Sequence, residues 1–151
     1  MKILDASSVQ ELTGRLQRLQ PDTRGRWGKM NAHQMVCHLR DSFGLAMGER
    51  AASESITLLN RTLIRWIALR APMEWPKGVP TRPEMDQLIG GTHPVEFSRD
   101  VADLSAAIRR FVLDPASFSF ARHPMFGELT RWEWMRWGYL HPDHHFRQFG
   151  L

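Results

Sequence analysis

Apolar side chains recur every three or four residues along much of the chain, and no stretch of useful length alternates as a half-buried strand does. The clearest example consists of five residues spaced 4, 3, 4 and 3 apart: Phe97, Val101, Leu104, Ile108 and Phe111. On a helix these positions form one continuous apolar stripe, suited to packing against other helices. The sequence therefore predicts an all-α protein.

Helix starts are marked by capping boxes, in which a polar cap residue precedes Glu or Gln by three positions. The three pairs are Ser8 with Glu11, Asn31 with Gln34, and Thr130 with Glu133. They predict a helix over residues 8–20, a second one closed by Gly48, and a third near the C-terminus. Two further apolar segments are expected to be helical. One is 56–70, which carries Leu59, Leu63, Trp66 and Ile67 on one face, and the other starts near Pro94.

Residues 71–94 contain five prolines and three glycines, too many for a regular element. We expect a long Pro/Gly-rich loop, held over one end of the helices by Trp75 and Met85. Four principal helices and one accessory helix then predict an antiparallel four-helix bundle, formed by a single domain over residues 1–151.

Composition excludes several classes of protein. The single cysteine, Cys37, rules out an internal disulfide and a Cys-rich metal site. No apolar run reaches the ~18 residues of a membrane span, and residues 1–10 lack the apolar stretch of a signal peptide, so we expect a cytoplasmic protein without membrane contact. The net charge is +4, but the basic residues are interspersed with acidic ones along most of the chain, which makes a nucleic-acid partner an unfavoured hypothesis.

Three histidines stand out by position. His141 and His145 are four residues apart, so on a helix both imidazoles lie on one face, and His38 lies on the inward face of another predicted helix. Together they can hold a divalent ion such as Zn, Ni or Fe while leaving a coordination position open. The competing interpretation is that they are ordinary polar residues near the end of the bundle.

Pro142 lies between the two C-terminal histidines and disfavours regular helix there. Either the helix kinks or a new turn starts at Pro142, and both arrangements can direct His141 and His145 to one ion. His144 points about 100° away from His145 around a helix. We therefore expect His144 to lie outside the ligand set.

Two carboxylates are weak catalytic candidates. Asp41 follows His38 by three residues, and Glu133 precedes His141 by two turns, so each can orient an imidazole or reach a water molecule at the metal. The alternative is a solvated or ion-paired carboxylate in both cases.

Four segments carry a resemblance to a known family. The stretch from Trp27 to Asp41 and the ending from Glu133 to Gly150 resemble the DinB/YfiT-like metalloenzyme superfamily. The segments Trp75–Thr81 and His123–Gly127 resemble one bacterial subfamily of unknown function. The resemblance implies a DinB-like four-helix bundle with a divalent metal on His38, His141 and His145. It also implies a low-molecular-weight thiol as a candidate cofactor, because relatives include thiol-dependent transferases and isomerases.

These observations predict a metal-dependent enzyme that activates water or a thiol for hydrolysis or transfer, on a small-molecule substrate that the sequence does not name. The alternative is a non-catalytic, stress-related protein that binds a metal or a small molecule. The sequence does not determine the oligomeric state, and a homodimer formed through an exposed helix face is one hypothesis for it.

Overall fold

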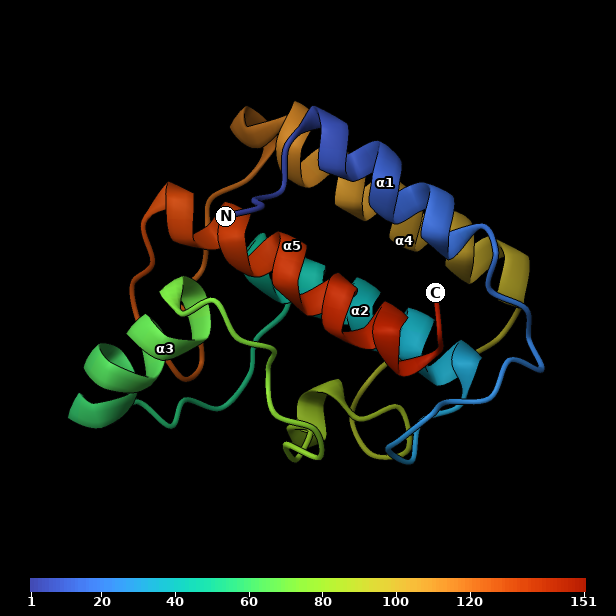
Figure 1. The fold of residues 1–151 in the computed structure, drawn as a ribbon, viewed down its shortest axis with the longest axis horizontal. Coiled ribbons are helices and arrows are strands. Elements are labelled where there is room, and N and C mark those ends of the chain that lie inside the picture. The colour runs from blue at the N-terminus through green and yellow to red at the C-terminus, as the bar shows by residue number, and fades with distance from the viewer.

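Five α-helices and no strand make up the computed structural model, which describes all 151 residues (Figure 1). The helices are α1 (Ala6–Leu16), α2 (Ala32–Ala46), α3 (Arg65–Arg70), α4 (Phe97–Leu113) and α5 (Arg131–Gln148). The only strand-like feature is an isolated bridge between His123 and Gly127. The prediction of an all-α protein is confirmed.

The core lies among α1, α2, α4 and α5. In Figure 1, α1 and α4 lie along one side of the molecule, while α5 crosses in front of α2. Both α1 and α2 pack against both α4 and α5. The largest fully buried side chains at these contacts include Leu12, Phe43, Phe111, Trp134 and Phe146. Their burial removes apolar area from water at roughly 25 cal/mol per Å², the main stabilisation of such a fold.

The stripe predicted on α4 faces this core. Leu104, Ile108 and Phe111 are fully buried, and Phe97 and Val101 are partly buried against the same cluster. The helix begins at Phe97, because the Glu96 carboxylate accepts the first free backbone N–H groups, from Ser98 and Arg99. It therefore starts slightly later than the predicted start near Pro94.

The first helix differs from the prediction at both ends. Its cap is Asp5, whose carboxylate accepts from the Ser8 backbone N–H, while the Ser8 hydroxyl accepts from the Asp5 N–H. Ser8 is thus the third residue of the helix rather than its cap, and α1 ends at Leu16 instead of Gln20. The predicted caps Asn31 and Thr130 are confirmed.

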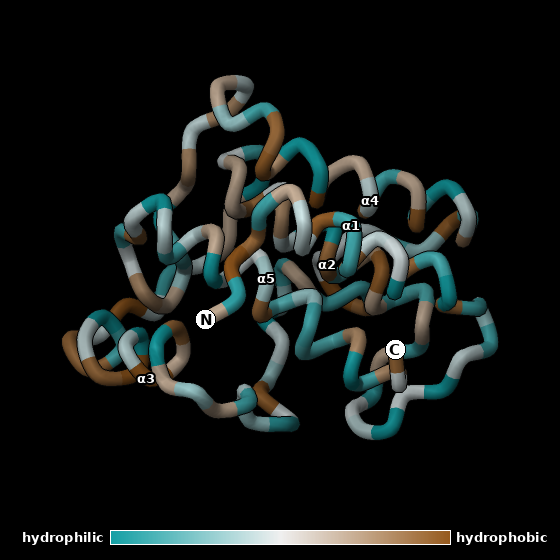
Figure 2. Tube along the Cα trace, turned by 45° about the horizontal axis from the view of Figure 1, so that its top comes forward, coloured by the Kyte–Doolittle hydropathy of each residue, from teal (hydrophilic) through white to brown (hydrophobic).

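The segment 56–70 is helical over residues 58–70, as predicted, but its apolar stripe is not buried. Residues Asn60–Ile64 form a π-helix before α3 begins. Leu59, Leu63 and Trp66 are 55%, 52% and 55% exposed. A π-helix has a different number of residues per turn, so a spacing of three and four no longer keeps side chains on one face. In Figure 2 the backbone trace at and beside α3, at the edge of the molecule, includes several strongly hydrophobic residues.

The face of α3 that meets α5 is held mainly by charge. Arg65 and Arg70 both reach the buried Glu133 carboxylate on α5, and Leu69 supplies the buried apolar contact of α3. The segment therefore presents Arg65, Leu69 and Arg70 to the rest of the protein, while Leu59 and Leu63 stay exposed.

The Pro/Gly-rich loop 71–94 lies against α2 and α5, as expected, and contains a short 3-10 turn, Pro83–Met85. Met85 is buried, and the Trp75 ring packs against the rings of His141 and His144. The loop is therefore positioned to cover the histidine end of the helices.

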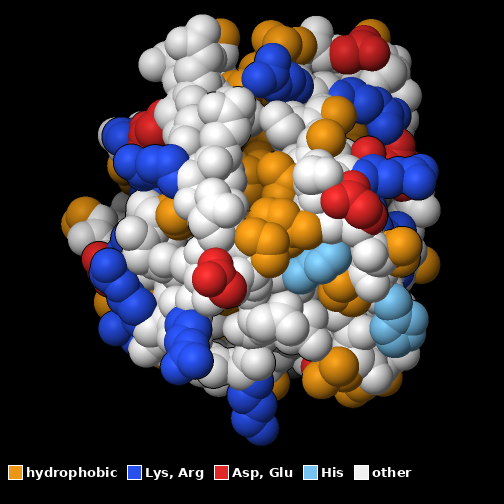
Figure 3. Space-filling model, turned by 90° about the vertical axis from the view of Figure 1, so that its right-hand side faces the viewer, with side chains coloured by type: hydrophobic (Ala, Val, Ile, Leu, Met, Phe, Trp, Pro, Cys, Tyr) orange, Lys and Arg blue, Asp and Glu red, His pale blue; other side chains and the backbone are white.

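The protein surface carries both signs of charge. On the face shown in Figure 3, basic and acidic side chains surround a central strip of hydrophobic ones. No helix combines the length and apolar composition that a membrane span requires.

Candidate metal centre

His38 on α2 and His141 and His145 on α5 come together in space. One ring nitrogen from each lies within 4.8 Å of the others. His38 and His145 are buried, at 6% and 8% exposure. The structure thus gathers the three histidines that the sequence singled out, from two helices far apart in the chain.

The His38 ring is fixed by a backbone carbonyl of the Pro/Gly-rich loop. Its Nδ1–H donates to the Met85 carbonyl oxygen at 3.0 Å, so Nδ1 must carry the proton. The lone pair of Nε2 is then free, and this atom lies 3.2 Å from Nε2 of His141. The loop therefore sets the tautomer of a candidate ligand.

The His145 ring is oriented through Gln148. The amide nitrogen of Gln148 donates to the Trp27 carbonyl at 2.7 Å, which turns the amide oxygen toward His145. Nδ1–H of His145 then donates to that oxygen at 2.8 Å, leaving Nε2 free. Gly28 permits this arrangement: its φ is +81°, and an added Cβ would stand 2.4 Å from the Gln148 amide nitrogen.

His141 is positioned by aromatic packing, and its one hydrogen-bond contact is the one between its Nε2 and Nε2 of His38. Its ring centre is 5.9 Å from that of Trp75 and 5.0 Å from that of Trp137. Its Nδ1 is buried and has no hydrogen-bond partner. Two of the three imidazoles are thus aimed by hydrogen bonds and the third by aromatic rings.

Pro142 does not divide the terminal helix. α5 continues from Arg131 to Gln148 with the proline inside it, so His141 and His145 remain one turn apart on the same face. Gly138 precedes Pro142 by four residues, where a proline ring crowds the carbonyl. An added Cβ on Gly138 would lie 3.0 Å from Leu4 and 3.2 Å from Phe111, so a larger residue there would crowd the core.

The three imidazoles favour the neutral form. Burial lowers the pKa of His38 and lowers the pKa values of His141 and His145 well below the ordinary histidine value. For His141 and His145 the neighbouring histidines add to the effect. Neutral imidazole is the form that binds metal ions.

A pocket of about 760 Å³ opens beside the three histidines. Its wall combines aromatic and apolar side chains with a few polar ones, the usual composition of a small-molecule site. Those nearest the histidines include Trp27, Trp75, Met85 and Trp137.

His144 lines this pocket but is not part of the cluster, as its direction around the helix predicted. Its ring centre lies 6.1 Å from that of Trp75 and 6.0 Å from that of Trp27. It therefore forms part of the pocket wall.

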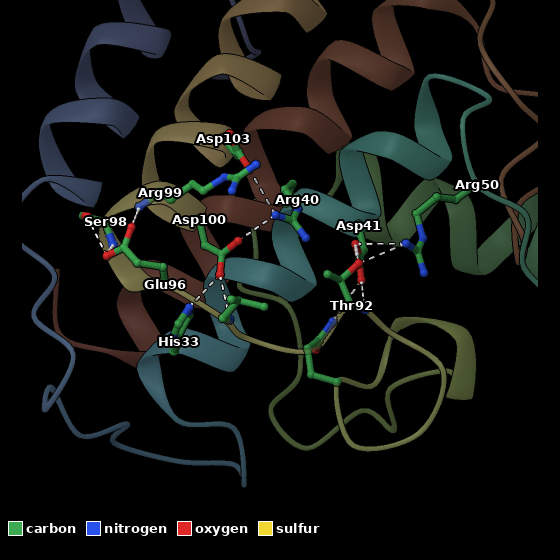
Figure 4. Close-up of polar contacts among 12 residues, drawn as sticks. His33, Arg40, Asp41, Arg50, Thr92, Glu96, Ser98, Arg99, Asp100 and Asp103 are labelled. Carbon is green, nitrogen blue, oxygen red and sulfur yellow. Dashed lines mark hydrogen bonds and ion pairs between the residues drawn. The ribbon is translucent and has the colours of Figure 1, made fainter.

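Asp41, one of the two carboxylates considered as catalytic candidates, is engaged elsewhere (Figure 4). It is 2% exposed and accepts hydrogen bonds from the Thr92 backbone N–H and hydroxyl, both at 2.7 Å, and from Gln87. Nη1 of Arg50 lies 3.3 Å from Oδ1 of Asp41. Asp41 does not line the pocket, and its contacts tie the Pro/Gly-rich loop to α2.

Glu133, the other candidate, is also outside the pocket. It is 1% exposed, pairs with Arg65 and Arg70, and accepts from the Thr130 backbone N–H at 2.9 Å. Its hydrogen-bonding capacity is used in joining α3 to the start of α5. Neither carboxylate is placed to act on a ligand beside the histidines.

A second group, His33, Cys37 and Asp100, also lies within ligand distance. Here the Asp100 carboxylate accepts from His33 and from Arg40, each at 2.7 Å (Figure 4). The guanidinium already supplies a positive charge, and burial raises the pKa of the Cys37 thiol to about 12. This group is an ion-pair network that joins α2 to α4.

Residues 1–150 match a family described as a protein of unknown function, DUF1569. The chain belongs to the DUF1569 family. Searches among curated proteins and among solved structures found no match. The family description names no activity, so the chemistry of this DUF1569 protein has to be argued from its site.

Gln148 provides a test of how the site is held. Gln148→Ala is expected to weaken metal binding by roughly 10- to 100-fold, the usual cost of losing a group that orients a ligand imidazole. Titration with Zn²⁺ against a chelating indicator measures this. Gln34→Ala is the matched control, because the Gln34 side chain accepts from the Asn31 N–H in the α2 cap. Equal affinities for both variants would contradict the role assigned to Gln148.

Several groups at the site carry no signal in the sequence. The Met85 and Trp27 carbonyls are backbone atoms, which residue identity does not reveal. Three tryptophans of the predicted helices lie in different environments: Trp134 is in the core, Trp66 is exposed, and Trp137 lines the pocket. Trp27 was missed, although its place directly before the Gly28 turn is the kind of signal that could have found it.

Proposed function

We propose that this DUF1569 protein is a metal-dependent enzyme in which His38, His141 and His145 hold one divalent ion beside a small-molecule pocket. The observation that carries the proposal is the convergence of three neutral imidazoles whose free nitrogens face one another. In two of them the opposite nitrogen is hydrogen-bonded, the arrangement usual for metal-binding histidines.

The residues fit a metal ion. In a tetrahedral zinc site with Zn–N distances of 2.0–2.1 Å, two ligand nitrogens stand about 3.3 Å apart. The two Nε2 atoms of His38 and His141 are 3.2 Å apart. A shared proton would also account for that pair, but it would leave the third imidazole, His145, turned toward them without a partner. Zn, Ni and Fe all suit a set of three imidazoles.

A bound ion would supply Lewis acidity toward a ligand atom in the pocket, which serves both hydrolysis and group transfer. The chain would contribute the rest. The Met85 carbonyl would orient the imidazole of His38, and Gln148 that of His145. Trp75 and Trp137 would shield the imidazole of His141 from water. Water or a low-molecular-weight thiol is the proposed nucleophile. The packing of α1, α2, α4 and α5 supports a DinB-like four-helix bundle as the scaffold.

A second candidate function is non-catalytic binding of a metal or small molecule. One observation favours it: the pocket offers little general-base chemistry. Asp41 and Glu133 lie outside it, and Asp86, the one carboxylate in its wall, accepts from the Leu88 N–H with one oxygen. An enzyme would then have to take its base from the ligand, from a histidine or from solvent.

Removing the metal is expected to lower the melting temperature. Free metal at 100 times its dissociation constant stabilises the folded state by about 2.7 kcal/mol, roughly 5 to 10 °C for a domain of this size. Calorimetry of untagged protein before and after chelation measures the shift, and elemental analysis should find one divalent ion per chain. Identical melting curves would contradict the metal site.

Turnover separates the two candidates. The metal-loaded protein is assayed with generic esters, amides and phosphoesters, and with a low-molecular-weight thiol plus an electrophile. An enzyme is expected to lose turnover in chelator and regain it when the metal is restored. Tight metal binding without turnover of any of these substrates favours the binding protein.

A further inference from the structure

A fourth histidine, His123, lines the same pocket from the connection between α4 and α5. Its backbone N–H and carbonyl both bond to Gly127, at 2.9 Å each, which closes a tight turn. Gly127 has a φ of +71°, a conformation that favours glycine. The turn therefore presents the His123 side chain from a fixed backbone.

The turn also fixes which ring nitrogen carries the proton. Nδ1 of His123 accepts the backbone N–H groups of Met125 and Phe126, both at 3.2 Å. A nitrogen that accepts has no proton, so in the neutral ring Nε2 carries it. The ring is stacked on Phe126, with centres 4.4 Å apart and planes 12° from parallel. Neither rotation nor tautomer exchange is available without breaking these contacts.

The Nε2–H group has no partner in the chain, and it is not among the fully buried polar atoms. It is thus a spare donor on a residue of the pocket wall. Arg82 lines the same pocket and carries only donors, which bond to the Ser53 carbonyl, the Ser55 hydroxyl and the Pro124 carbonyl. Burial, together with the Arg82 charge, lowers the pKa of His123 to about 3, so the donor is a neutral imidazole near pH 7.

The Trp137 ring links this donor to the proposed metal centre. Its centre is 6.2 Å from the ring of His123 and 5.0 Å from the ring of His141. A small molecule with an apolar body can therefore lie against Trp137, with one end near the three histidines and the other near His123.

We propose that His123 is a ligand-binding residue whose Nε2–H donates to a carbonyl or carboxylate oxygen of a small amphipathic molecule in the pocket. The proposal deepens the proposed function and rests on it in one respect, that the pocket is the ligand site. A purely structural role is the competing explanation, in which His123 serves only to accept the two backbone N–H groups.

His123→Asn separates the two explanations. The Asn side-chain oxygen can accept the same backbone N–H groups as Nδ1, but Asn places no donor where Nε2 lies. The probes are 3-phenylpropanoate and 3-phenylpropylamine, which share an apolar body and differ in the head group. Isothermal calorimetry compares them on wild type and variant, each in zinc-loaded and chelated form.

Wild type is expected to bind the carboxylate and not the amine. His123→Asn is expected to bind the carboxylate about tenfold more weakly than wild type, in both the zinc-loaded and the chelated protein. Its melting temperature should equal that of wild type. Nitrogen NMR of the wild type should show the Nε2–H tautomer of His123 throughout pH 5–8. The proposal is overturned if His123→Asn binds the carboxylate as tightly as wild type does, or if wild type does not bind it. It is also overturned if NMR shows the His123 ring to be charged or protonated at Nδ1. If only the proposed metal centre is wrong, zinc will not bind, but wild type and His123→Asn will still differ in carboxylate affinity in the chelated form. Failure of the metal centre is therefore distinguishable from failure of the His123 proposal.

Discussion

Alanine at His38, His141 or His145 is expected to abolish tight binding of a divalent ion, whereas His144→Ala should retain it. Each of the three replacements removes one of three ligand nitrogens that lie within 4.8 Å of one another. The expected loss of affinity exceeds about 100-fold, the upper value for merely disturbing a group that orients a ligand. Zinc titration and elemental analysis of the four variants measure it.

His144→Ala is the matched control because it removes an imidazole from the same helical turn. His144 lies beside Trp27 and Trp75 in the pocket wall, outside the cluster. Loss of metal with His144→Ala and retention with His145→Ala would show that α5 is broken at Pro142. Retention of metal in all four variants would leave the histidines as polar residues at one end of the helices.

The histidine cluster was predictable because spacing on a helix determines direction. The four-residue interval between His141 and His145 specifies one face, and the position of His38 on an apolar stripe specifies an inward face. Helix packing then brings the two faces together. The capping boxes at Asn31 and Thr130 were predictable for the same reason, since they depend only on neighbours in sequence.

Features that depend on distant contacts were not predictable. The apolar pattern of 56–70 indicates a buried face, but the Arg65 and Arg70 pairs with Glu133 turn that face outward. Asp41 is near His38 in sequence, yet its carboxylate accepts hydrogen bonds from Thr92, which lies in a loop about 50 residues later. In both cases the partner is chosen by tertiary structure, and local spacing carries no information about it.

Glu133→Gln is expected to lower the free energy of unfolding at pH 7 by about 2 kcal/mol. Burial by itself would raise the pKa of Glu133, but hydrogen bonds from Arg65, Thr130 and Arg70 outweigh it and lower the pKa to about 2. A shift of that size from 4.5 corresponds to about 3 kcal/mol. Partial exposure of the two arginines reduces the expected loss. Urea denaturation of wild type and variant measures the difference.

The same difference should depend on pH in a defined direction. Because the folded-state pKa of Glu133 lies below its unfolded value, the stabilisation is complete above about pH 5 and is lost as the pH falls from 4.5 toward 2. The wild type and Glu133→Gln should therefore converge in stability over that window. Glu128→Gln is the control, since the Glu128 side chain is 78% exposed and its ion pair with Arg122 should contribute less than about 0.5 kcal/mol. A gap between wild type and Glu133→Gln that stays constant from pH 7 to pH 3 would show that α3 is not anchored to α5 by this carboxylate.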